Sequence, residues 1–185
     1  MDDVAARARS LLGRMFHGHG VTLLITEVEA YGGVDDPASH AFTRTPRSEI
    51  MYGDPWHLYV YRSYGMHVCA NVVTGPTDRA AAVLIRAGKI VEGVELARER
   101  RGTAPKDVAL ARGPGNLAKS LGLTLADLGA PLLVPGGVFL GAPPVEVPAV
   151  SAGPRVGVSR AADVAWRFWI TGDRTVSAYR RSPRA

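Results

Sequence analysis

The sequence has one cysteine, few aromatic residues (7%) and no long hydrophobic run, and these scarcities exclude several classes of protein. Cys69 alone cannot form an intramolecular disulfide framework or a multi-cysteine zinc or iron–sulfur site. No apolar stretch reaches the ~18 residues of a membrane helix, so we expect no membrane partner. Residues 1–9 mix acidic and basic side chains without an apolar centre. We therefore expect no secretion signal and a cytoplasmic location, in a bacterial-type cytosol or nucleoid.

The composition is that of a folded globular protein, with 46% hydrophobic and 21% charged residues in a chain of 185. This length can enclose one sizeable core, and neither a repeat nor a long linker divides the sequence. We therefore expect a single domain over residues 1–185. The net charge of +5 favours a polyanionic partner.

The segment 57–73 has the pattern of a β-hairpin, because apolar and polar side chains alternate on both sides of a short interruption. Gly65 can supply the positive φ of a tight turn. Arg62 and Tyr64 are unusual there, since turns favour small polar residues. Tyr64 has two interpretations: a wedge that enters a base stack, or a packing residue folded back on the strands. The hairpin alone favours packing.

The segment 21–31 has the pattern of a strand that carries two carboxylates. It would place six side chains on one face: Val21, Leu23, Ile25, Glu27, Glu29 and Tyr31. Residues two apart on a strand are separated by about 6.6–7 Å. Because an unpaired buried carboxylate is costly, inward-facing glutamates here would be candidates for chemistry. In the alternative interpretation, the sheet ends at Thr26 and both glutamates are solvated.

Other segments indicate the remaining elements. Residues 4–12 have the periodicity of an amphipathic helix, 80–87 that of a buried strand and 89–101 that of a second helix. Arg86 closes the predicted strand and needs an anionic partner, for which Glu27 or Glu29 is available. The segment 32–51 reads as a long loop, and such loops are usually functional or disordered.

Several of these segments together resemble the alkyladenine (3-methyladenine) DNA glycosylase family, over nearly the whole chain and in order. The specific parts are the glutamate strand and the tyrosine hairpin. The matching stretches are Thr26–Tyr31, Asp36–His40, Arg44–Arg47, Leu58–Met66 with Asn71, Ala82–Arg86, Gly113–Gly115 and Arg155–Val158. One departure is Ser48, where the family usually has asparagine.

The resemblance implies a fold and an activity. The fold would be α+β, a single domain with a curved, mainly antiparallel sheet, flanking helices and a protruding DNA-intercalating β-hairpin. The activity would be that of a monofunctional DNA-3-methyladenine glycosylase in base-excision repair. Such an enzyme flips alkylated or deaminated purines (3-methyladenine, 7-methylguanine, hypoxanthine, ethenoadenine) from duplex DNA and hydrolyses the N-glycosidic bond. The partner would be double-stranded DNA with damaged purines, the enzyme a monomer, and neither metal nor cofactor would be needed.

The resemblance also implies catalytic roles. Glu29 would be the general base that activates water, and Arg86 with the backbone carbonyl of Val156 would help to hold that water. Glu27 would support Glu29 from further inside the sheet.

Further roles concern the substrate. Tyr31, His40 and Tyr61 would line the base pocket. Asn71 would lie under the base and disfavour the 2-amino group of guanine. Tyr64 would fill the gap left by the flipped nucleotide.

Two other functions fit parts of the sequence. A small glycoside hydrolase could use Glu27 and Glu29 as an acid–base pair, since their separation is compatible. It would leave the positive charge and Tyr64 unexplained. A non-catalytic nucleic-acid-binding module, such as a formyltransferase-like accessory domain, would explain charge and aromatics but leave Glu29 idle.

Overall fold

The computed structural model describes residues 2–102, 106–146 and 148–185. The α-helices and strands follow in chain order: α1 (Asp2–Leu11), β1 (Met15–Gly18), β2 (Val21–Tyr31), β3 (Leu58–Ser63), β4 (His67–Val73), β5 (Ala82–Glu92), α2 (Val94–Arg101), α3 (Pro114–Leu121), β6 (Val138–Leu140), β7 (Val150–Gly153) and β8 (Arg167–Ile170). Short 3₁₀ turns occur at Gly33–Asp35, Glu49–Tyr52, Asp107–Ala109 and Leu125–Asp127.

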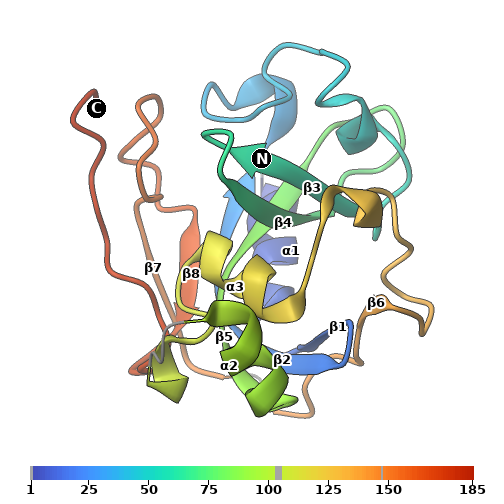
Figure 1. Cartoon of the computed structure of the whole chain (residues 1–185). Coiled ribbons are helices and arrows are strands. Elements are labelled where there is room, and N and C mark those ends of the chain that lie inside the picture. The colour runs from blue at the N-terminus through green and yellow to red at the C-terminus, as the bar shows by residue number, and fades with distance from the viewer. Residues whose placement is uncertain (1, 103–105, 147) are drawn as a thin grey trace.

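One curved antiparallel sheet organises the fold, in the order β3-β4-β5-β2-β1-β6 (Figure 1). Strand β2 is central because β5 pairs along one edge, while β1 and β8 pair with successive halves of the other. Strand β7 pairs with β8. Helix α3 packs on β4 and β5, and α1 packs on β2. The expected α+β class with a curved antiparallel sheet and flanking helices is confirmed.

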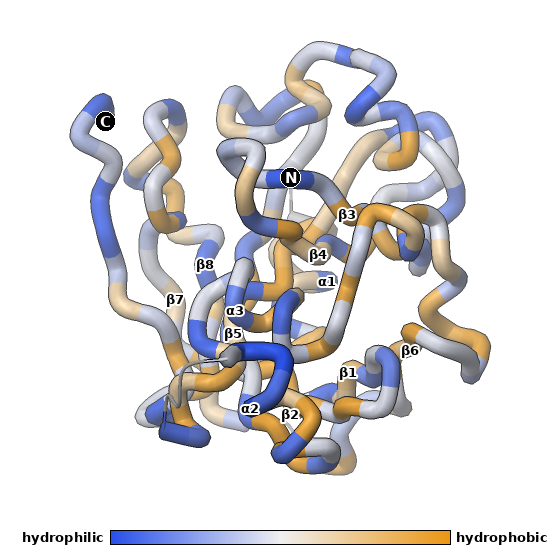
Figure 2. Tube along the Cα trace, in the orientation of Figure 1, coloured by the Kyte–Doolittle hydropathy of each residue, from blue (hydrophilic) through white to orange (hydrophobic). Residues whose placement is uncertain are grey.

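The main core lies on the helix-covered side of the sheet. It combines apolar residues of α1 and α3 with alternate residues of the strands, among them Leu58, Val60, Ala70 and Val72. Figure 2 shows the hydrophobic colour along the central strands and a largely hydrophilic α2. In the described part of the chain, no helix is long and apolar enough to cross a membrane.

The pairing of β2 with β5 is interrupted by three register shifts, of which two lie around Glu27, between Ile25 and Glu27 and between Glu27 and Val28. A bulged residue turns the side chains that follow it to the other face of a strand. The expectation that six alternate residues share one face is therefore wrong. Before the shift the core receives Val21, Leu23 and Ile25; after it, the core receives Val28 and Ala30. The side chains of Glu27, Glu29 and Tyr31 are thereby turned away from the core.

The predicted boundary between the next strand and helix is also wrong. Strand β5 runs on to Glu92, so residues 89–92 are extended, and Arg86 lies inside the strand instead of closing it. The extension follows from pairing, because Glu92 lies opposite Thr22 of β2. Gly93 then adopts a φ of 72°, which ends the strand before α2 begins.

The close approach of β2 and β5 yields a prediction at Gly88. A Cβ added there would lie 2.5 Å from Cδ1 of Leu23 and 2.8 Å from the carbonyl oxygen of Leu24. We expect Gly88→Ala to lower the free energy of unfolding by about 1–3 kcal/mol, measured by urea denaturation, because the strands must separate. Gly136→Ala is the matched control, since its Cβ would meet nothing closer than 3.9 Å. Equal stability of the two variants would contradict the prediction.

Candidate active site

A cleft of about 840 Å³ opens on the face of the sheet opposite the main core. Its walls come from β2, β3, β4 and β5, the loop after β2 and the segment after β7. All eight site residues expected from the sequence line it: Glu29, Tyr31, His40, Tyr61, Tyr64, Asn71, Arg86 and Val156. The structure thus brings them together; their individual roles stay predictions.

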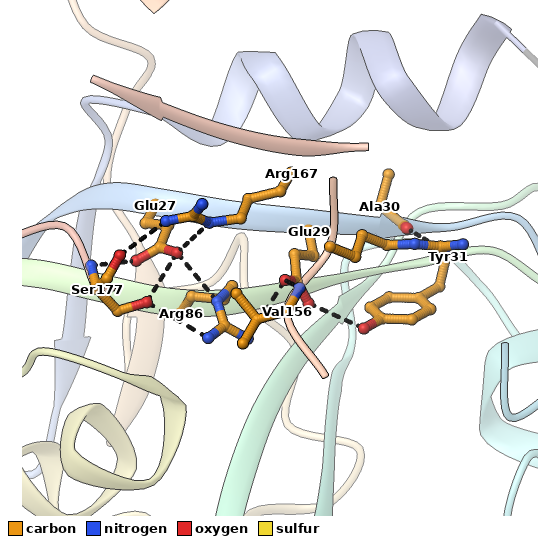
Figure 3. Close-up of polar contacts among 9 residues, drawn as sticks. Glu27, Glu29, Ala30, Tyr31, Arg86, Val156, Arg167 and Ser177 are labelled. Carbon is orange, nitrogen blue, oxygen red and sulfur yellow. Dashed lines mark hydrogen bonds and ion pairs between the residues drawn. The ribbon is translucent and has the colours of Figure 1, made fainter. Parts of the chain in front are cut away.

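Glu29 is fully buried, and three groups hold its carboxylate (Figure 3). Oε1 accepts a hydrogen bond of 2.7 Å from the amide N–H of Val156 and lies 3.3 Å from Nη1 of Arg86. Oε2 accepts one of 2.9 Å from the hydroxyl of Tyr31. The alternative in which the sheet ends at Thr26 and the glutamates are solvated is therefore wrong.

Glu27 is equally buried but is held differently. Its Oε1 accepts from Nε of Arg86 (3.0 Å), Nε of Arg167 (2.7 Å) and Oγ of Ser177 (2.9 Å). Its Oε2 accepts from the amide N–H of Ser177 (2.7 Å). Each carboxylate oxygen offers about two acceptor positions, so Oε2 of Glu29, which accepts only from Tyr31, has room for one more donor. Glu29 lines the cleft, and Glu27 is not among its lining residues.

Arg86 joins the two carboxylates, which confirms the expected ion pair and extends it to both partners. Burial opposes the charge of Arg86, but the adjacent Glu29 and Glu27 outweigh it and raise its pKa. Burial, followed by the negative charge of Glu29, raises the pKa of Tyr31 well above 10. The Tyr31 hydroxyl therefore keeps its proton and remains a donor to Glu29.

Arg155 fixes the segment that carries Val156. Its guanidinium is almost fully buried and forms a bidentate pair with Asp36, at 2.6 and 2.9 Å. Nη1 also donates to the carbonyl of Ala30 (2.9 Å), and Cζ lies 4.8 Å from the ring centroid of Tyr31. Val156 meets Glu29 through its N–H, and the water-holding role of its carbonyl remains a prediction.

Aromatic rings form one wall of the cleft. The rings of His40 and Tyr61 meet edge to face with centroids 4.6 Å apart, and Nδ1 of His40 lies 3.0 Å from the hydroxyl of Tyr59. The guanidinium of Arg47 lies 4.7 Å from the Tyr61 centroid. Neither Tyr59 nor Arg47 is among the site residues expected from the sequence. Tyr59 could have been found, because it lies two residues from Tyr61 and so shares its face of the strand.

Asn71 lies opposite Tyr59 in the hairpin and is buried. Its Nδ2 donates a 3.1 Å hydrogen bond to the carbonyl of Tyr59, which fixes the amide against the strand. A locked amide at the cleft wall presents a fixed outline to whatever enters. Its effect on guanine remains a prediction.

The β3–β4 hairpin carries Tyr64 at its tip. Strands β3 and β4 pair from Leu58 opposite Val72 to Ser63 opposite His67, so Arg62 lies in β3 and the turn comprises residues 64–66. Tyr64 and Gly65 have positive φ angles of 50° and 70°. The Tyr64 residue is 90% exposed, which rules out the interpretation that it packs back on the strands.

Ser48, the departure from the family pattern, is fully buried in the loop. Its Oγ accepts a 2.9 Å hydrogen bond from the amide N–H of Thr45. A serine therefore supplies an acceptor that holds this turn.

Within the described residues, no group of three or more histidine, cysteine, aspartate or glutamate side chains is placed to hold a metal ion.

Comparison with known proteins shows the family to which the chain is similar. The sequence profile described as "Methylpurine-DNA glycosylase (MPG)" matches residues 1–174. A protein of Mycobacterium tuberculosis (strain ATCC 25618 / H37Rv) is 50% identical over 194 residues, covering 99% of this chain and 93% of its own. One of Mycobacterium leprae (strain TN) is 48% identical, covering 99% and 88%. Both bear the name "Putative 3-methyladenine DNA glycosylase".

The chain belongs to the methylpurine-DNA glycosylase family. The family expected from the sequence is thereby confirmed, together with the class of enzyme, a monofunctional DNA glycosylase of base-excision repair that acts on DNA. The cleft is then the candidate active site of a methylpurine-DNA glycosylase, and neither a glycoside hydrolase nor a binding module without catalysis describes the chain.

The charge state of His40 gives a prediction for this site. His40 is exposed at the cleft wall, and partial desolvation of its ring, followed by the positive charge of Arg47, lowers its pKa from 6.5 to about 4. We expect its imidazole to remain neutral in NMR titrations from pH 7 to 5. Because folding disfavours the charged ring, its contribution to stability falls as the pH drops from 6.5 towards 4.

The variant Arg47→Ala separates the two causes of this shift. Removing the positive charge should raise the titration midpoint of His40 but leave it below 6.5, because desolvation of the ring is the larger cause. A midpoint at or above 6.5 in the unmodified protein would contradict the prediction.

Proposed function

We propose that this chain excises alkylated or deaminated purines from duplex DNA, among them 3-methyladenine, 7-methylguanine, hypoxanthine and ethenoadenine. A base inside a duplex is out of reach, so the target nucleotide must first be flipped out, at a cost of a few kcal/mol. Water then cleaves the N-glycosidic bond and leaves an abasic site. The observation that carries the proposal is the buried Glu29 carboxylate, with one acceptor position to spare, in the wall of an aromatic cleft.

Glu29 is the proposed general base. Its remaining acceptor position can receive a hydrogen bond from water, whose proton it takes as the oxygen attacks C1′ of the sugar. Departure of the base builds positive charge on the sugar, as in glycoside hydrolysis. A carboxylate held by Arg86, Tyr31 and Val156 faces that charge without reorganising, and the carbonyl of Val156 is proposed to help hold the water.

The aromatic wall is the proposed base pocket. Methylation at N3 or N7 makes a purine cationic, and each aromatic face can contribute about 0.5–2 kcal/mol to binding such a cation. Tyr31, Tyr61 and His40 supply the rings. A neutral His40 also avoids adding a charge that would repel the cationic base. Asn71 is proposed to disfavour the 2-amino group of guanine.

The hairpin tip is the proposed wedge. Stacking of an aromatic ring on nucleic acid bases contributes about 1–3 kcal/mol per base, which offsets part of the cost of flipping. Tyr64 is exposed and lines the cleft, which supports this role. Arg47, Arg62 and Arg160 also line the cleft and can contact phosphates, consistent with the net positive charge.

Replacement of the proposed base gives the central test. We expect Glu29→Gln to slow excision by about 10²–10⁴-fold, because the amide keeps the size of the side chain but cannot accept the proton. The measurement is single-turnover cleavage of duplexes that carry one hypoxanthine or ethenoadenine, followed as alkali-labile sites.

The control is Glu95→Gln, which changes a highly exposed carboxylate and should leave the rate unaltered. Binding of the lesion duplex by Glu29→Gln should persist. Excision within tenfold of the unmodified protein would refute the assignment of Glu29.

Removal of the tip ring tests the wedge. Tyr64→Ala should weaken binding to lesion duplexes and shift the flipping equilibrium, followed by stopped-flow fluorescence of ethenoadenine. The melting temperature should stay unchanged, because so exposed a ring packs on little. Tyr64→Phe should match the unmodified protein, since stacking uses the ring face. An unaltered flipping equilibrium in Tyr64→Ala would exclude the wedge.

A further inference from the structure

Beyond β8 the chain contacts the cluster around Glu27 through Ser177. Every polar group of Ser177 is engaged there. Its N–H donates to Oε2 of Glu27, and its hydroxyl donates to Oε1. The same hydroxyl accepts a 3.3 Å hydrogen bond from Nη2 of Arg86, and its carbonyl accepts one of 2.7 Å from Nη2 of Arg167.

The segment around Ser177 is held by hydrogen bonds on both sides of that residue. Before it, the hydroxyl of Thr175 lies 2.7 Å from that of Thr26, the residue at the bulge of β2, and Thr175 is buried. After it, the carbonyl of Arg180 accepts a 2.9 Å hydrogen bond from the N–H of Gly157. Gly157 follows Val156, whose N–H holds Glu29.

A continuous line of contacts therefore runs from Ser177 to Glu29. Ser177 and Arg167 hold the carboxylate of Glu27 (Figure 3). Glu27 in turn accepts from Nε of Arg86, and the Ser177 hydroxyl accepts from Nη2. The third nitrogen, Nη1, then lies 3.3 Å from Oε1 of Glu29. A guanidinium is a planar, rigid fork, so fixing two of its nitrogens fixes the direction of the third.

We propose that Ser177 is a positioning residue for excision, acting through Glu27 and Arg86 to aim the Arg86 guanidinium at Glu29. The inference rests on the proposed function, because it assigns Ser177 to the placement of the proposed base. The family match ends at residue 174, so it gives no role to Ser177. With the hydroxyl removed, Nη2 of Arg86 loses an acceptor and Glu27 loses a donor, and the guanidinium can turn from Glu29.

The test uses the full chain with three substitutions. Ser177→Ala removes the hydroxyl and Ser177→Thr keeps it. Ser182→Ala is the control in the same segment, where the hydroxyl accepts a 3.2 Å hydrogen bond from the nearby amide N–H of Arg184. Single-turnover excision of an ethenoadenine duplex at saturating enzyme is measured beside the dissociation constant for the same duplex and the melting temperature.

We expect Ser177→Ala to slow excision by about 10- to 100-fold, since small misplacements of catalytic groups have effects of this size. The dissociation constant should not change, and Ser177→Thr should restore most of the rate. A merely structural serine would not produce this split between rate and binding. If Ser177→Ala melts below the assay temperature, Ser177→Cys carries the same test, because a thiol is only a weak donor and acceptor.

Two results would overturn the inference while the proposed function stands. One is an excision rate of Ser177→Ala equal to that of Ser182→Ala. The other is a parallel loss of rate, affinity and melting temperature that Ser177→Thr does not restore. Failure of the unmodified protein to excise any purine lesion would instead refute the proposed function, and this inference with it.

Discussion

The structure depends on the compensation of two buried carboxylates. Glu27 and Glu29 are both fully buried, and an uncompensated charge in such a place is costly by several kcal/mol. Groups from distant segments compensate the two charges: Arg86 from β5, Arg167 from β8, and the amides of Val156 and Ser177. The return of the C-terminal third of the chain to β2 is therefore part of what makes the carboxylates tolerable.

The two carboxylates of this cluster differ in their partners and in whether they line the cleft. Glu27 receives four hydrogen bonds and is not among the residues that line the cleft. Glu29 is held by three groups and lines the cleft. One carboxylate thus anchors the arginines, and its neighbour two residues away remains available for chemistry.

The sequence predicted β2 to the residue and the alternation of the hairpin, because these depend on local patterns. It did not predict that the core-facing side chains of β2 change from odd-numbered to even-numbered positions at Thr26. That change comes from a bulge in the pairing with β5, which has no local signal in the sequence. The limits of β5 were missed for the same reason. The residues of the cleft were found through the resemblance, whereas Ser177 lies beyond every motif and is brought in only by tertiary contacts.

The loop after β2 shows how a long irregular segment becomes a wall. Arg155, hidden beneath it, ties Asp36 to the backbone of Ala30 and faces the ring of Tyr31. The part of the loop around His40 is held against Tyr59 and Tyr61. Order in this loop thus comes from a few buried polar contacts and aromatic rings, which places His40 without regular secondary structure.

The backbone at the hairpin tip has a consequence for how the protein can be stabilised. Tyr64 holds a φ of 50°, a region that glycine or asparagine occupies at lower cost than an aromatic residue does. The fold alone would therefore favour a different residue at this position. Selection for thermal stability alone would therefore replace Tyr64. A more stable turn and an aromatic ring at the hairpin tip are thus opposing requirements at this position.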